Sequence, residues 1–156
     1  MKRIFAAIFA MGLLLPAVIH AADVKPQANA KQDAVWMTDF AAAQALAKKE
    51  NKPMLVDFTG SDWCGWCIKL DREVFTQPAF LDYAKKNLVL VKIDFPRNIP
   101  QTDAVKKQNR QLSAKYGIEG FPTILMMKAD GKIIGRTGYQ RGGAENYVKH
   151  LQGILK

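Results

Sequence analysis

The chain has 156 residues, 49% of them hydrophobic, which suits one domain whose core does not depend on disulfides. Its formal net charge is +9, but the lysines and arginines are interleaved with acidic residues and form no basic stripe beside aromatic side chains. This pattern argues against nucleic-acid binding. Two cysteines are too few for a disulfide-stapled scaffold, so their chemistry matters more than their number.

The N-terminal segment has the layout of a secretory signal peptide, in which basic residues precede an apolar run, here at 4–19, and small residues follow. A retained membrane anchor is the alternative. However, the run is shorter than the roughly 20 residues of a spanning helix, and it contains Pro16. We therefore expect a cleaved signal peptide at 1–21 and a flexible lead-in at 22–35. The expected destination is an oxidising exported compartment, with the bacterial periplasm favoured over secretion.

The rest of the chain, 36–156, alternates helical and strand-like patterns and is expected to form one domain. In its first helix, Phe40, Ala43 and Ala47 repeat on one face, with Thr38 as the N-cap. Helices are expected at 38–51, 68–75, 78–87, 102–117 and 144–155, and strands at 52–58, 88–95, 122–128 and 132–138. An Asp-Gly turn between the last two strands indicates a hairpin. This order predicts an α/β fold, with a central mixed β-sheet flanked by helices on both faces.

The only cysteines, Cys64 and Cys67, form a C-x-x-C pair. Structural zinc needs four N/S ligands, which this chain does not offer near the pair. Haem attachment needs a histidine where Ile68 stands. A structural disulfide closing so short a loop would stabilise the fold little. Redox exchange is favoured, and soft-metal (copper) binding through the two thiols, including a site bridging two chains, stays open.

The expected position of the pair, between a strand and a helix, supports redox chemistry. The positive end of a helix favours a thiolate over a thiol, and the thiolate is the attacking species. Cys64 is therefore interpreted as the nucleophile. Cys67, one helical turn further on and more enclosed, is interpreted as the resolving cysteine.

Three motifs together resemble the thioredoxin superfamily. They are "LVDF" before the pair, "WCGWC" itself and "AKYGIEGFPTILMMKADGK" after it, followed by an amphipathic helix. The resemblance covers 36–156 and is strongest to exported, periplasmic thioredoxin-like reductases with a bulky active-site dipeptide. It implies the thioredoxin fold and a redox-active disulfide between Cys64 and Cys67.

The resemblance also implies roles for residues around the dithiol. Pro122 matches the family's proline that follows a cis peptide bond, which would place Phe121 next to the sulfur atoms. Trp63 matches the tryptophan that shields the first cysteine. The positions expected to contact substrate are Trp63, Gly65, Trp66, Phe121 and Pro122.

Asp57 matches the family's buried acid, although one extra residue separates it from the first cysteine. Burial would raise the pKa of this carboxyl group, so that it can accept the proton of Cys67 during resolution. The alternative is a strand-end aspartate bonded to backbone. The family's partner lysine falls on Leu90 here, and Lys92, on the same strand face, is expected to substitute for it.

Trp66 stands where relatives carry proline or histidine. It cannot stabilise the Cys64 thiolate with a positive charge, which argues for a reducing or intermediate potential. A buried core tryptophan is the alternative, and an exposed docking surface is favoured. The helix also has Arg72 where thioredoxin carries a proline.

The sequence therefore predicts an exported protein-disulfide oxidoreductase, with reductase favoured over oxidase or isomerase. Expected partners are protein disulfide or dithiol substrates and a membrane electron donor, because no flavin or nicotinamide motif is found. No cofactor, resident metal or nucleic acid is expected, and the protein is expected to be a monomer. A non-catalytic binding module, including one for soft metals, is the alternative of another class.

Overall fold

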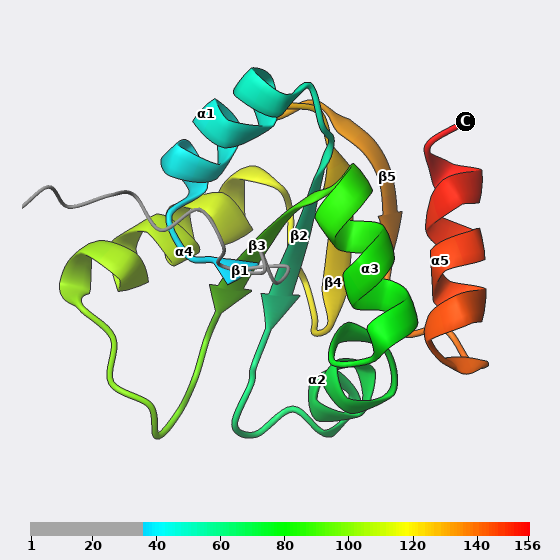
Figure 1. Cartoon of the computed structure of the whole chain (residues 1–156). Coiled ribbons are helices and arrows are strands. Elements are labelled where there is room, and N and C mark those ends of the chain that lie inside the picture. Colours follow the sequence, from blue (N-terminus) through cyan, green and yellow to red (C-terminus); the bar gives the residue numbers. More distant parts are fainter. Residues whose placement is uncertain (1–35) are drawn as a thin grey trace, which may run out of the picture. The chain divides into compact units, whose positions relative to one another are not determined.

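Residues 36–156 of this chain are described by a computed structural model (Figure 1). The expected signal peptide, 1–21, and lead-in, 22–35, lie outside the described residues. The strands are β1 (Trp36–Met37), β2 (Met54–Thr59), β3 (Val89–Asp94), β4 (Thr123–Met127) and β5 (Ile133–Thr137). The helices are α1 (Phe40–Glu50), α2 (Gly65–Leu70), the π-helical turn η1 (Asp71–Phe75), α3 (Pro78–Asn87), α4 (Asp103–Lys115) and α5 (Gly143–Ile154).

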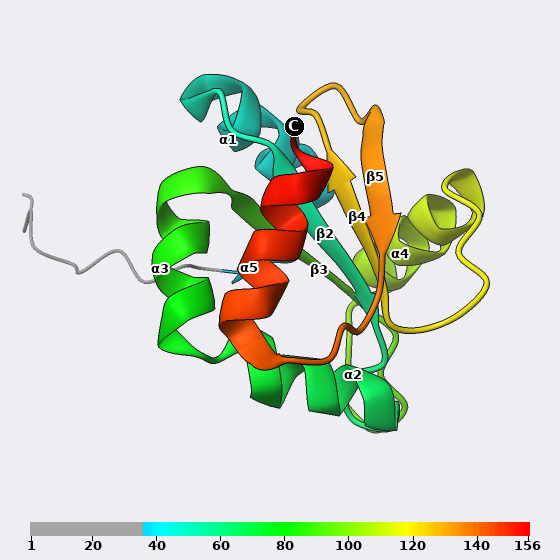
Figure 2. The same cartoon turned by 90° about the vertical axis from the view of Figure 1, so that its right-hand side faces the viewer.

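The five strands form one mixed sheet in the order β1-β3-β2-β4-β5. Strands β1, β3 and β2 are parallel, whereas β4 is antiparallel to β2 and β5 is antiparallel to β4. Helices α1 and α4 lie on one face, and α3 and α5 lie on the other (Figures 1 and 2). This arrangement confirms the predicted α/β sheet covered on both faces. Within 36–156, no helix combines the length and apolar character needed to cross a membrane.

The central strand β2 is buried along its whole length because helices cover both of its faces. Met54, Val56 and Phe58 pack into the apolar cluster beneath α1 and α4. Leu55 packs into the second cluster, formed with α3, η1 and α5. Side chains alternate along a strand, so Asp57 shares the face of Leu55. The acid is thus directed toward the side of the sheet that carries α3 and α5.

Two of the predicted helix starts are wrong. The N-cap of α1 is Asp39 rather than Thr38, since the Asp39 carboxylate accepts the Ala42 N–H at 3.0 Å. Both residue types cap helices well, so the pattern of apolar residues could not choose between them. The helix after β2 begins at Gly65, three residues before the expected start at Ile68.

This helix does not stay α-helical to its end. After Leu70 it continues as η1, where the Thr76 N–H donates to the Asp71 carbonyl five residues back, at 3.0 Å. Arg72 lies inside this turn, at the position of thioredoxin's proline. A proline removes an N–H donor, whereas Arg72 keeps one, and the turn closes with the wider hydrogen-bond spacing of a π-bulge.

The other elements lie close to their predicted positions. The hairpin between β4 and β5 is confirmed, with Gly131 at a φ of 86° in its turn. A glycine is favoured there because side chains rarely tolerate a positive φ. The two-residue strand β1, which pairs with β3, was not predicted, because it is too short to show a repeating pattern.

Candidate active site

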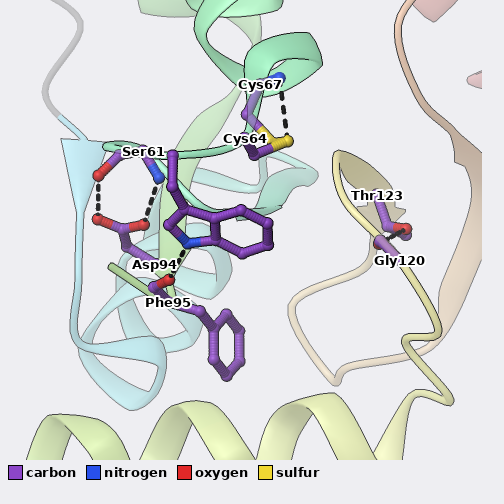
Figure 3. The surroundings of a disulfide bond; sticks show 8 residues. Ser61, Cys64, Cys67, Asp94, Phe95, Gly120 and Thr123 are labelled. Carbon is purple, nitrogen blue, oxygen red and sulfur yellow. Dashed lines mark hydrogen bonds between the residues drawn. A yellow bond between two sulfur atoms is a disulfide. The ribbon is translucent and has the colours of Figure 1, made fainter. Parts of the chain in front are cut away.

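The two cysteines form a disulfide at the N-terminus of α2 (Figure 3). Cys64 is the N-cap residue of this helix, and its Sγ accepts the Cys67 N–H at 3.3 Å. Their Cα atoms lie 5.2 Å apart. Cys64 is 8% exposed and Cys67 is 4% exposed, which agrees with the expected order of enclosure. Sγ of Cys64 thus lies where a helix offers free N–H groups and its positive end.

The turn that leads to Cys64 begins at Gly60, directly after β2. The Gly60 carbonyl accepts the N–H groups of Trp63 and Cys64 at 3.2 and 2.9 Å. A Cβ at Gly60 would lie 2.5 Å from the Trp63 ring, so glycine at this position leaves room for the indole. Ser61 then anchors the turn to β3, since its N–H and Oγ–H both donate to the Asp94 carboxylate, at 2.9 and 2.6 Å.

Trp63 forms one side of the site. Its indole Nε1–H donates to the Phe95 carbonyl at 2.8 Å, just beyond β3. Phe121 meets its ring edge to face, with centroids 6.0 Å apart, and also stacks on Phe95 at 5.1 Å. The Arg97 guanidinium lies 4.1 Å from the centre of the indole ring. Trp63 is therefore fixed by a hydrogen bond and by contacts on its ring, while 37% of its surface stays exposed.

Trp66, which stands between the two cysteines in the chain, is not a core residue, since 54% of its surface is exposed. Tyr139, which follows β5, lies 5.3 Å away between ring centroids. The Lys69 ammonium lies 5.2 Å from the centre of each of these two rings. Tyr139 in turn donates its O–H to Glu73 at 2.6 Å. Each cysteine is therefore preceded by a tryptophan that contacts a cation and another aromatic ring.

The Phe121–Pro122 peptide bond is cis, as the resemblance implied. It leads directly into β4, and the Thr123 hydroxyl donates to the Gly120 carbonyl at 2.7 Å (Figure 3). Because Phe121 packs against Trp63, this loop borders the same surface as the disulfide. Gly65, the first residue of α2, leaves open space where a side chain would otherwise stand.

Asp57 lies on β2, the strand that leads into the active-site turn, and is 3% exposed. Its Oδ1 has no hydrogen-bond partner. Burial raises the pKa of the carboxyl group to about 7, against a smaller lowering by the Lys92 charge. Asp71 and Asp94 add further raising contributions. A carboxyl group with such a pKa takes up and releases protons near neutral pH.

Lys92 lies opposite Asp57 in the register of β2 and β3, but its ion pair is made elsewhere. Its Nζ lies 3.6 Å from Oδ1 of Asp71, at the start of η1, and 5.2 Å from the centre of the Trp36 ring. Among the described residues, no ion pair joins Lys92 to Asp57. Lys92 thus lowers the pKa of Asp57 through its charge alone, and Asp71 offsets part of that charge.

Several residues of this site were not found from the sequence. Asp62, Phe95 and Arg97 belong to it because the segment after β3 is bonded to the turn before Cys64. The bonded residues are 32 to 36 positions apart along the chain. Tyr139 approaches Trp66 from after β5. None of these residues stands in a motif, so no sequence signal pointed to them.

The arrangement suits thiol–disulfide exchange. It combines a cysteine at a helix N-terminus, a second cysteine within bonding distance and a buried carboxyl group that titrates near neutral pH. In 36–156, no group of three or more histidine, cysteine or acidic side chains is placed to hold a metal ion.

Comparisons with known proteins also indicate thiol–disulfide chemistry. Residues 40–153 match the family model described as "Thioredoxin-like domain". The chain is 36% identical over 117 residues to the disulfide bond reductase DsbH of Chlamydia pneumoniae, covering 75% of this chain and 70% of that protein. It is 32% identical over 104 residues to the thioredoxin-related protein DsbJ of the same organism, covering 67% of this chain but only 30% of that protein.

Solved structures agree with this result. The structure titled "DsbH Oxidoreductase" superposes with a TM-score of 0.75 at 31% identity and covers 94% of each chain. A thioredoxin from Thermus thermophilus superposes with a TM-score of 0.57 at 17% identity, covering 78% of this chain and 88% of its own. The second likeness shows the fold alone.

Proposed function

Since this chain belongs to the thioredoxin-like domain family, we propose that it is a protein-disulfide oxidoreductase that works as a reductase in the bacterial periplasm. The observation that carries the proposal is the Cys64–Cys67 pair at the start of α2, with the Cys67 N–H directed at Sγ of Cys64. The relative that is 36% identical is named a disulfide bond reductase, which supports the same chemistry here.

The reaction begins from the reduced dithiol. The Cys64 thiolate attacks one sulfur of a substrate disulfide, a new S–S bond forms and the substrate S–S bond breaks. The released substrate thiolate takes a proton from solvent. The Cys67 thiolate then attacks Sγ of Cys64, which closes the Cys64–Cys67 disulfide and releases the second substrate thiolate. Two electrons have then passed from the dithiol to the substrate.

Asp57 is proposed to accept the proton that Cys67 loses in the second step. Its carboxyl group is buried on the α3 and α5 side of the sheet, and Oδ1 has no competing hydrogen bond. A base with a pKa of about 7 is charged often enough at neutral pH to take a thiol proton. A water molecule that bridges the Cys67 thiol and the Asp57 carboxylate would relay this proton equally well.

Trp63, Gly65, Trp66, Phe121 and Pro122 are proposed to contact the substrate chain. The two tryptophans are exposed and each precedes a cysteine of the pair, and Gly65 has open space where a side chain would stand. The cis bond before Pro122 turns the backbone at the edge of this surface. Exposed aromatic rings with polar edges suit partly unfolded protein chains, which present both apolar side chains and free backbone groups.

Reduction is favoured over oxidation because of what surrounds Sγ of Cys64. Strong oxidants of this type stabilise the reduced form through the thiolate. Trp66 supplies no positive charge of its own, and among the described residues the one hydrogen bond to Sγ comes from the Cys67 N–H. Arg97 and Lys69 stack on the rings of Trp63 and Trp66, and neither donates a hydrogen bond to Sγ. Beyond the helix end and the Cys67 N–H, the thiolate therefore gains little stabilisation, which favours a low reduction potential.

Turnover requires a source of two electrons after each cycle, and we propose a membrane protein that presents a dithiol. The protein is proposed to act as an exported monomer after removal of residues 1–21. An oxidising compartment makes such a donor necessary, since thiols there tend to remain disulfide-bonded.

The test is the reduction potential of the Cys64–Cys67 pair, measured on residues 22–156 in thiol–disulfide buffers. We expect a value near that of thioredoxin, about −270 mV. A value near about −120 mV would reverse the proposed direction and make the protein an oxidant. A Cys67→Ser variant, which cannot close the disulfide, provides the baseline. If no two-electron transition appears, copper binding to the two thiols should be measured next, because it is then the leading alternative.

A further inference from the structure

The segment after β3 forms part of the active-site surface. The Asp62 carboxylate, two residues before Cys64, accepts the N–H of Arg97 at 2.9 Å and that of Asn98 at 2.6 Å. With the bond from Trp63 to the Phe95 carbonyl, these contacts hold residues 95–98 against the turn that carries the nucleophile. The backbone of Arg97 is therefore held next to the turn that leads to Cys64.

The Arg97 guanidinium is held by the face of the Trp63 ring, 4.1 Å from its centre. Among the described residues, the hydrogen bonds that Arg97 donates come from its backbone N–H, so the guanidinium donors stay available to a ligand. Asp62 accepts hydrogen bonds from backbone N–H groups rather than from the guanidinium. In the described part of the chain, Arg97 makes no ion pair, and the residue is exposed. A cation with free donors thus lies on Trp63, the residue that precedes Cys64.

A second cation lies on Trp66, the residue that precedes Cys67. Lys69 lies over Trp66, and its nearest carboxylate, Glu73, is 4.0 Å away and already bound to Tyr139. Without the proposed signal peptide, which contains Lys2 and Arg3, the chain carries 21 lysines and arginines against 14 acidic residues. The long-range field therefore attracts acidic partners, and the two stacked cations are the local groups that would meet them.

We propose that Arg97 is a specificity-determining residue, which binds a carboxylate of the substrate chain next to the disulfide under attack. The preferred substrates are then proteins with acidic residues flanking the target cysteine. This inference rests on the proposed function, because it concerns the substrate of the same dithiol. Guanidinium groups bind carboxylates through paired N–H donors, and the Trp63 face keeps those donors in position.

The test uses two synthetic peptides that each contain one disulfide and differ only beside one cysteine. One peptide carries Glu on both sides of that cysteine, and the other carries Gln. The pre-reduced protein is mixed with each peptide, and the second-order rate of exchange is followed by tryptophan fluorescence. At low salt we expect the Glu peptide to react about 2- to 5-fold faster, the range for an exposed ion pair. The preference should shrink in 0.5 M salt, because screening weakens exposed charge pairs.

Three variants test whether Arg97 causes the preference for the Glu peptide. Arg97→Gln should remove most of the preference and leave only what Lys69 and the net charge supply. Arg97→Lys should keep more of it, and Arg97→Glu should abolish it. Arg110→Gln is the matched control. Arg110 is an exposed residue of α4, and α4 lies apart from α2 in both views (Figures 1 and 2). This control should keep the wild-type ratio.

The outcomes separate the inference from the proposed function. If neither peptide is reduced, the oxidoreductase proposal itself is wrong. If both are reduced at equal rates in the wild-type protein, the specificity inference is overturned while the function stands. An equal slowing of both peptides by Arg97→Gln would also overturn it, since that result indicates that Arg97 acts on the Cys64 thiolate.

Discussion

At the scale of single residues, Asp57 lowers the stability of the sheet, because burying its charged carboxylate is unfavourable. It is a carboxyl group buried among apolar side chains on β2, with one oxygen unpartnered. Burial raises the pKa of its carboxyl group to about 7 from the ordinary value of 3.8. A stable core would hold an apolar residue there, so the acid is expected to serve the reaction rather than the fold.

Replacing Asp57 by Asn should therefore stabilise the protein at alkaline pH. Between pH 4 and 7 the folded state holds a proton that the unfolded state has released, so the wild-type free energy of unfolding falls as pH rises. At about 1.36 kcal/mol for each pKa unit, the variant should gain on the order of 4 kcal/mol at pH 8 and little at pH 3. Urea unfolding at both pH values measures this. Equal gains at the two pH values would contradict the assigned pKa.

At the scale of elements, the segment from 60 to 64 and the segment from 94 to 98 are held together by side-chain hydrogen bonds rather than by strand pairing. Ser61 bonds to Asp94, and Asp62 bonds to the backbone of Arg97 and Asn98. These bonds lower the pKa of the Asp62 carboxyl group, chiefly through the N–H of Arg97. Because the charged carboxylate is the form that is bonded, the contact holds at neutral pH and weakens when the pH falls through this lowered pKa.

Asp62→Asn should loosen this junction without unfolding the domain. An amide oxygen accepts the N–H groups of Arg97 and Asn98 more weakly than a carboxylate does. We expect faster hydrogen exchange at these two amides and unchanged exchange in the strands, as measured by NMR. Asp103→Asn is the matched control, because it changes an exposed acid on α4. Unchanged protection in Asp62→Asn would show that other contacts hold the segment.

At the scale of the whole molecule, the sheet separates two apolar clusters. Neighbouring residues of β4 serve different clusters, since Leu125 packs beneath α1 and α4 and Met126 packs beneath α3 and α5. Both side chains are fully buried. Both apolar clusters support the active site, because the turn that carries Cys64 and the helix α2 come after β2, the central strand between the two clusters.

Shortening a buried side chain on either face of the sheet should therefore lower the free energy of unfolding by a similar amount. Leu125→Ala and Met126→Ala should each lower the free energy of unfolding by about 2–5 kcal/mol, the range for large-to-alanine changes in cores. Ile133→Ala, at an exposed position of β5, should change it by about 0.5 kcal/mol or less. Chemical denaturation of the three variants provides the comparison. A small loss for only one of the two buried positions would indicate that its cluster can collapse around the gap.

The sequence by itself determined the order of helices and strands, the position of the dithiol between β2 and α2, and the placing of Asp57 in a buried strand. These features depend on the spacing of apolar residues over short stretches and on residue types at turns, which are local properties. Local patterns failed where neighbouring residues were equally suitable, as with Thr38 and Asp39, and where a helix changed its hydrogen-bond spacing at η1.

Only the tertiary structure decided which distant side chains meet at the site. The contact of Trp63 with Arg97, that of Trp66 with Tyr139, and the pairing of Lys92 with Asp71 each join separate elements. They depend on the register of β2 against β3, on the π-turn and on the path of the loops, none of which leaves a repeat in the sequence. The chemistry of the dithiol can thus be read from a short motif, whereas the charge and shape presented to a substrate arise when the sheet brings loops from different strands together.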